Sequence, residues 1–218
     1  MNNRTPELLN ETLSEELAWR KKELSTLLLL AEDRNNSPAK RNALVRAGIA
    51  LLYAHWEGFI KAASAAYLEF VAAQRLKYNE LAPNFVALGM RAELNEAGAA
   101  FKSEIHNRVA DFFINRLSEE SKIPYKEMIR TSNLNAMELK NIVAMLGLDY
   151  SSYALKQNLI DEQLLYSRNN IAHGNYMRVE LADYIEWQEQ VISMLDLFRN
   201  QIENAAIMES YRIKPPSQ

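Results

Sequence analysis

Two long stretches of the chain, residues 6–33 and 38–78, repeat apolar residues at three- and four-residue spacing with few interruptions. This spacing places the apolar side chains on one face of an α-helix. The first face consists of Leu9, Leu13, Leu17, Leu24, Leu27 and Leu28, and the second includes Leu44, Gly48, Leu51, Leu52, His55, Phe59, Ala62, Ala63, Ala66 and Phe70. No stretch alternates apolar and polar residues as a half-buried strand does. The sequence therefore predicts an all-α protein built on long amphipathic helices.

The starts of these helices carry recognisable signals. Thr5 precedes Pro6, which fits an N-cap residue followed by proline at the first helical position. Ser37 precedes Pro38 in the same way and follows a polar run that breaks the first helix. Two separate helices joined by a short turn are therefore expected here.

The rest of the chain predicts further helices. Residues 79–158 are less regular, and we interpret them as a helical insertion between the core helices of an antiparallel bundle. Ser132 or Asn133 is expected to cap a short helix that ends at Gly147. We expect one all-α domain over residues 1–218, with an N-terminal helix in 1–36, further helices at about 83–95, 99–117, 135–146, 159–173 and 180–211, and a flexible tail at 212–218.

Composition narrows the classes of protein that this chain can belong to. It has no cysteine, which excludes disulfides and thiolate metal sites. The N-terminus is polar where a signal peptide needs an apolar core, and residues 27–31 are too short an apolar run to cross a bilayer. We expect a cytoplasmic protein that does not bind membranes. The net charge of -3 argues against general nucleic-acid binding, so any RNA must meet a local basic patch, a small cleft or a site shared by two subunits.

One short string concentrates the polar chemistry of the chain. It reads Arg168, Asn169, Asn170, Ile171, Ala172, His173 and Gly174, and it holds one of only three histidines. On a helix, Asn169 and His173 share a face, and Arg168 lies about 140° around the axis from His173. The long arginine side chain can still reach a phosphate held near the imidazole. Gly174 is expected to end the helix as its C′ residue.

These side chains fit RNA cleavage without a metal. Imidazole gains and loses a proton near neutral pH, so His173 can transfer protons to or from the 2′-hydroxyl and the leaving 5′-oxygen. The guanidinium of Arg168 matches phosphate oxygens and can stabilise a phosphorane-like transition state. Asn169 can orient His173 or bind the phosphate. No cluster of carboxylates at metal-ligand spacing lies beside the string, so we expect neither a metal nor another cofactor.

A structural interpretation of the same string stays open. Arg168 can pair with a nearby carboxylate such as Asp161 or Glu162, and Asn169 can act as a cap. His173 can simply interact favourably with the C-terminal end of the helix dipole. Both interpretations place the three side chains at the end of a helix.

The string and three others together resemble HEPN domains of the MAE type. The other strings are residues 54–61 (Ala-His-Trp-Glu-Gly-Phe-Ile-Lys), 131–134 (Thr-Ser-Asn-Leu) and 146–149 (Leu-Gly-Leu-Asp), and the resemblance covers roughly residues 40–207. It implies an all-helical bundle and a metal-independent endoribonuclease of toxin–antitoxin or anti-phage systems. The catalytic Arg and His of the family fall on Arg168 and His173, and its polar residue after the Arg falls on Asn169.

The resemblance also implies partners. Two copies of the chain would form a homodimer whose composite site holds two motifs, which supplies a second imidazole. The substrate would be RNA, and a cognate antitoxin protein is a further candidate partner. Two rival hypotheses remain, a non-catalytic helical module for dimerisation or partner binding, and a nucleotide-binding module that uses Arg168 and His173 as ligands.

Six more residues are candidates for substrate binding or for support of the motif. His55 lies on the apolar face of its helix, which is typical of a core histidine, whereas Glu57 and Lys61 have the spacing of a helical ion pair. In the functional interpretation, His55 or Lys61 lines the same cleft as Arg168. The other candidates, next to the motif histidine, are Asn170, Asn175 and Tyr176. Asn175 and Tyr176 can contact a base or anchor a loop.

Overall fold

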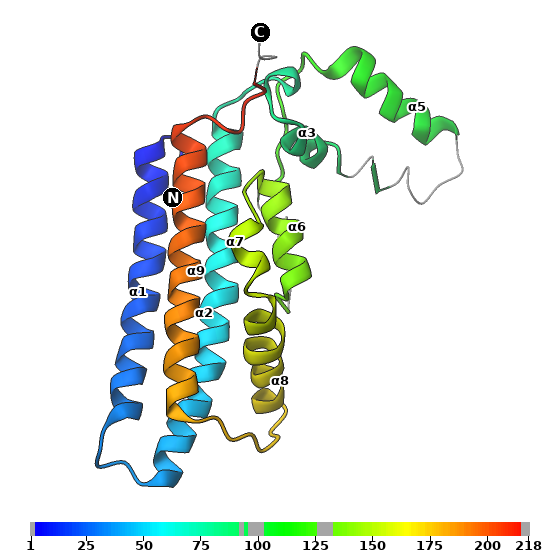
Figure 1. Ribbon diagram of the computed structural model, residues 1–218. Helices are drawn as coiled ribbons and strands as arrows, with labels where there is room; N and C mark the ends of the chain where they lie inside the picture. The colour runs from blue at the N-terminus through cyan, green and yellow to red at the C-terminus, as the bar shows by residue number, and fades with distance from the viewer. Residues whose placement is uncertain (1–2, 92–93, 96–102, 126–132, 215–218) are drawn as a thin grey trace.

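Three long helices dominate the computed structural model, which describes residues 3–91, 94–95, 103–125 and 133–214. They are α1 (Pro6–Glu32), α2 (Pro38–Ala73) and α9 (Leu181–Ile207). Each contacts the other two, and they lie side by side along the length of the bundle (Figure 1). No strand occurs among the described residues, where only two isolated β-bridges are formed. The predicted all-α helical fold is confirmed.

The predicted starts of the first two helices are confirmed, and the predicted ends of α2 and α9 are not. The Thr5 hydroxyl caps α1 by accepting from the Leu8 N–H (3.4 Å), and the Ser37 hydroxyl caps α2 in the same way. α2 ends at Ala73 rather than at residue 78, because Arg75 adopts a positive φ of 51° and turns the chain into the 3-10 helix η1 (Tyr78–Glu80). α9 ends at Ile207 rather than at residue 211, and a second positive φ follows at position 209.

Large aromatic side chains fill the core. Six of the largest fully buried ones come from α2 and α9, and Phe85 of α3 and Tyr153 of α7 are buried as well; the six are Trp56, Phe59, Tyr67, Phe70, Tyr184 and Phe198. α2 and α9 approach closely at Gly48, where a Cβ atom would lie 2.6 Å from Cζ of Tyr184. Burial of this apolar surface is the main favourable contribution to folding.

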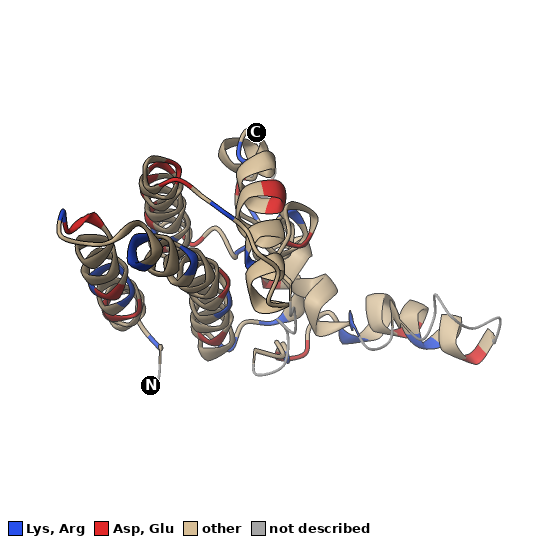
Figure 2. Ribbon diagram, turned by 90° about the horizontal axis from the view of Figure 1, so that it is seen from below, with Lys and Arg blue, Asp and Glu red and all other residues tan. Residues whose placement is uncertain are grey.

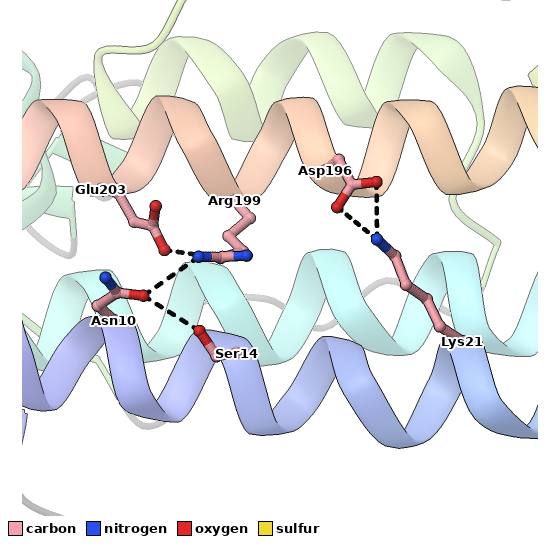
Figure 3. A network of polar contacts seen from close by, with 6 residues as sticks. All are labelled: Asn10, Ser14, Lys21, Asp196, Arg199 and Glu203. Atoms are coloured by element: carbon pink, nitrogen blue, oxygen red, sulfur yellow. Dashed lines mark hydrogen bonds and ion pairs between the residues drawn. The ribbon is translucent and has the colours of Figure 1, made fainter.

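Polar contacts also join α1 to α9, near the surface of the bundle (Figure 3). Lys21 Nζ lies 2.6 and 2.7 Å from the two carboxylate oxygens of Asp196. Arg199 donates to Glu203 in its own helix (2.6 Å) and to Oδ1 of Asn10 in α1 (3.3 Å). These partly exposed contacts fix the register of the two helices more than they stabilise the fold.

The described residues between 79 and 158 form shorter helices beside this bundle. They are α3 (Pro83–Gly89), α5 (Ser103–Asp111), the π-helical segment η2 (Phe112–Arg116), α6 (Ala136–Leu146) and α7 (Ser151–Ala154). α6 contacts both α2 and α3, whereas α5 extends away from the bundle (Figure 1). The predicted helices over 83–95 and 99–117 correspond to α3 and to α5 with η2, while residues 92–93 and 96–102 lie outside the described ranges.

The cap of α6 differs from the prediction. Asn135 is its N-cap and accepts from the Glu138 N–H (2.8 Å), so the predicted cap at Asn133 is wrong, and Ser132 lies outside the described residues. Asn135 lies directly before the first helical turn, so its side-chain oxygen can accept from an N–H of that turn that has no partner within the helix. The predicted end at Gly147 is confirmed by its φ of 69°. Asn133 is therefore not the cap, and its side chain accepts a hydrogen bond from Arg168 instead.

Charged residues of both signs are spread over the helices (Figure 2). Of the helices in the described part of the chain, none is long and apolar enough for a membrane span. Residues 215–218 of the predicted tail lie outside the described part.

Candidate functional site

The motif helix is built from two kinds of helical turn. The predicted helix over 159–173 begins as the π-helical segment η3 (Leu159–Leu165) and continues as α8 (Tyr166–Ala172). The Tyr166 N–H donates to the Asp161 carbonyl, five residues back, which marks the wider turn. Both η3 and α8 contact α2, and the buried apolar residues of this helix, Leu159, Ile160 and Leu164, all lie in η3. The side chain of Asp161 accepts from the backbone N–H of Ala136 at the start of α6 (2.7 Å).

α8 ends in a Schellman motif that holds His173 at the C-cap. Gly174 has a φ of 77° and donates its N–H to the Ile171 carbonyl (3.1 Å). The Asn175 N–H donates to the carbonyl of Asn170 (2.9 Å). These two bonds are the 5→2 and 6→1 pair of the motif, and glycine is favoured at C′ because the backbone is left-handed there. The predicted helix end at Gly174 is confirmed, and the His173 side chain is exposed to solvent.

Asparagine side chains reinforce this helix end. Asn170 donates to the Tyr166 carbonyl one turn earlier (2.9 Å) and accepts from the side chain of Asn175 (3.1 Å). The Asn169 side chain is half-buried on the same helix. Asn170 and Asn175 therefore fasten the backbone around His173.

The loop that follows is tied to α2. Arg46 donates to the carbonyls of Asn175 (3.1 Å) and Met177 (3.4 Å). Its guanidinium carbon lies 5.9 Å from the ring centre of Tyr176, a side chain that is 81% exposed. The loop thus exposes the Tyr176 ring beside the motif. The Arg46 guanidinium holds the loop backbone by hydrogen bonds and lies close to this ring.

The Arg168 side chain contacts Tyr53 of α2 and Asn133, which lies just before α6. Its guanidinium carbon lies 4.2 Å above the ring centre of Tyr53, a cation–π contact. Its Nη2 donates to Oδ1 of Asn133 (2.8 Å). Arg168 is half-buried against the buried Tyr53, whereas Asn133 is exposed and its hydrogen bond with Arg168 lies at the surface.

A polar network on α2 surrounds this contact. The Tyr53 hydroxyl donates to Glu57 (2.7 Å), which also accepts from Lys61, and the Leu134 N–H donates to the Tyr53 hydroxyl (2.6 Å). Burial, and then the hydrogen bond to Glu57, raise the pKa of Tyr53 to about 12. Although burial works to raise the pKa of the Glu57 carboxyl, hydrogen bonds from Lys61, Tyr53 and the backbone lower it overall. Glu57 is therefore a carboxylate and Tyr53 a neutral phenol at neutral pH.

His55 faces another direction. It is buried, its Nε2 lies 2.7 Å from Oε2 of Glu23 in α1, and its ring packs edge-on against Trp19 with centroids 5.0 Å apart. Burial lowers the pKa of His55 more than the Glu23 carboxylate raises it. The structure brings Glu57 and Lys61 into the network that reaches Arg168, and it does not bring His55 there.

Tyr53 and Arg46 were not among the residues expected at the site, and Asn133 was expected only as a helix cap and as part of the 131–134 string. A signal existed for Tyr53, because it lies four and eight residues before Glu57 and Lys61 and so shares their face of α2. No local pattern pairs Asn133 or Arg46 with residues of the motif.

The arrangement combines an exposed imidazole, a guanidinium held by a ring and an amide, and a second guanidinium at the neighbouring loop. Such groups can transfer a proton and bind a phosphate. Within the described residues, no three His, Asp or Glu side chains are placed to hold a metal ion together.

The chain matches the family model of MAE_28990-like HEPN domains over residues 9–211. No curated protein and no solved structure matches it.

Proposed function

Because the chain belongs to the MAE_28990-like HEPN family, we propose that it is a metal-independent endoribonuclease of toxin–antitoxin or anti-phage type. The observation that carries this proposal is the end of α8, where a solvent-exposed His173 follows Arg168 at the spacing of the family motif. HEPN domains are often ribonucleases, and both side chains suit acid–base work on a phosphodiester. The physiological partners would be RNA and a cognate antitoxin.

In the proposed reaction the 2′-oxygen attacks the adjacent phosphorus as its proton passes to a base. The O2′–P bond forms, the P–O5′ bond breaks, and the departing O5′ takes a proton from an acid. The products are a 2′,3′-cyclic phosphate and a 5′-hydroxyl. His173 would transfer these protons, and Arg168 would stabilise the charge that develops on the phosphoryl oxygens. Asn169 would orient the imidazole or contact the phosphate.

A homodimer would supply the second imidazole that separate acid and base roles require. HEPN domains commonly dimerise, and a two-fold axis would bring two copies of the motif to one cleft. A face of α2 beside the motif is suited to such a contact. Ala43, Ala47 and Ala54 are exposed there, and Ala50 between them is half-buried. Small side chains let a second helix approach closely, so we propose this face as the dimer contact.

Cleavage of a short RNA in EDTA tests the proposal. Wild type is compared with His173→Ala and Arg168→Ala, and with the matched controls His106→Ala and Arg34→Ala, which remove exposed side chains elsewhere. We expect cleavage by wild type and both controls, and none by the two motif variants. Circular dichroism and molecular mass are recorded for every variant.

A non-catalytic binding module remains the second candidate, because the contacts of Arg168 with Tyr53 and Asn133 would also serve a purely structural arginine. Folded proteins that all fail to cut RNA would favour this module. Cutting by His173→Ala at the wild-type rate would remove the imidazole from the mechanism.

A further inference from the structure

The contact between Asn133 and Arg168 joins the 79–158 segment to the motif. The Asn133 amide oxygen accepts from Nη2 of Arg168 at 2.8 Å across 35 residues of sequence. We propose that Asn133 is a positioning residue, which together with the ring of Tyr53 sets the direction of the Arg168 guanidinium for phosphate binding. This inference rests on the proposed ribonuclease function and adds a residue from outside the motif to its site.

Two contacts of this kind are enough to orient a guanidinium. The group is planar and carries five N–H donors in fixed directions. The Tyr53 ring, 4.2 Å from the guanidinium carbon, limits the position of the group from one side. The hydrogen bond to Asn133 limits rotation about the last side-chain bonds. Once one donor is fixed, the directions of the other four N–H groups follow.

Asn133 is itself held in place by its neighbours. The next residue, Leu134, is fully buried, and its N–H donates to the Tyr53 hydroxyl (2.6 Å). Two residues further on, the Ala136 N–H donates to Asp161 of η3 (2.7 Å). Residues 133–136 are therefore held against α2, which carries Tyr53, and against η3, which continues into the arginine's own helix α8. An acceptor on so constrained a backbone can hold a partner in one direction.

The chemistry of an amide also suits this position. A carboxylate here would form an ion pair with Arg168 and compete with the phosphate for its positive charge. The amide oxygen accepts the same hydrogen bond without a charge of its own. The carboxylate of Glu57, which belongs to the same network, accepts from Lys61 and Tyr53. The arrangement thus orients the guanidinium while its charge remains available to a phosphate.

Steady-state kinetics on a short RNA oligonucleotide in EDTA tests the inference, with wild type, Asn133→Ala, Asn133→Asp and Arg168→Ala. The matched control is Asn141→Ala, which removes an exposed asparagine of α6. Because misplacement of a catalytic group by about 1 Å costs on the order of 100-fold in rate, we expect kcat of Asn133→Ala to fall about 10- to 100-fold. KM is expected to stay within about twofold, because the loss falls on the transition state.

Two further results are expected on this basis. Asn133→Asp keeps an acceptor in place but pairs with the arginine charge, so its kcat should lie between those of Asn133→Ala and wild type. Asn133→Ala should lower kcat much less in an Arg168→Lys background, because lysine has no planar guanidinium to orient and a positioning residue acts only through its partner. Should Asn133→Ala fail to fold, Asn133→Ser decides the question, since its hydroxyl is too short to replace the amide oxygen.

Wild-type kcat in a folded Asn133→Ala, together with an inactive Arg168→Ala, would overturn the positioning role and leave the proposed function intact. Absence of cleavage by the wild type, or full cleavage by Arg168→Ala, would overturn the two together. A rise in KM at constant kcat would also contradict the inference, because it would assign Asn133 to substrate binding in the ground state.

Discussion

Gly174, which follows the motif histidine, allows a prediction of how much stability a substitution costs, because the cost depends on the backbone conformation alone. Gly174 has a φ of 77°, and a Cβ atom added there would meet nothing within 4 Å. The substitution Gly174→Ala therefore introduces no clash and only the cost of a left-handed backbone. That cost is roughly 1–2 kcal/mol for an L-residue. For a chain of this size it corresponds to a fall in Tm of about 2–8 °C.

Urea unfolding monitored by circular dichroism measures this change, and Gly147→Ala provides the matched comparison. Gly147 has a similar φ of 69°, but its Cβ would lie 3.0 Å from Nδ2 of Asn84, so its substitution should cost at least as much. Gly147 is distant in sequence from the motif and ends α6. If the Schellman end positions His173, RNA cleavage should fall in Gly174→Ala and persist in folded Gly147→Ala. A Gly174→Ala protein as stable as wild type would refute the left-handed helix end.

Two other predictions concern His55 and the proposed dimer contact. The folded-state pKa of His55 is lowered from its ordinary value of 6.5, so its contribution to stability is complete above that value and is lost as pH falls through the folded pKa. Urea unfolding at pH 7.5 and 5.5 should show a larger acid-induced loss in wild type than in His55→Gln, and equal losses would contradict the account. Ala54→Arg should shift the molar mass in light scattering from dimer to monomer and abolish cleavage, whereas Ala18→Arg, on the exposed face of α1, should do neither. A dimeric Ala54→Arg protein would exclude this face of α2.

Helix starts and the end of the motif helix were predictable because their causes are local. Thr5 and Ser37 each precede a proline, and Gly174 follows the last residue with a helical pattern. Capping depends on a few neighbouring backbone groups, which a short string of sequence determines. The sequence suggests Asn133 as the cap of α6, whereas Asn135 is the cap. The two residues carry the same side chain and lie two positions apart, so the local sequence does not distinguish them.

The π-helical turns of η3 and the surroundings of Arg168 could not be predicted in this way. A helical apolar pattern is the same for an α-helix and for an α-helix that contains one wide turn. The partners of Arg168 lie on α2 and in the 79–158 segment, so their approach depends on the packing of three elements. The direction of His55 likewise depended on its burial against α1 and on the position of Glu23. Amphipathic spacing identifies a buried face but not the helix that covers it.

The chemistry of the cut ends tests the central claim most directly. Purified wild-type protein and His173→Ala are each incubated with a defined RNA in EDTA, and the ends of any fragments are identified by mass spectrometry. The account predicts fragments with 2′,3′-cyclic phosphate and 5′-hydroxyl ends from the wild type, and intact RNA with His173→Ala. Fragments that carry 3′-hydroxyl and 5′-phosphate ends, or equal cleavage by both proteins, would contradict it.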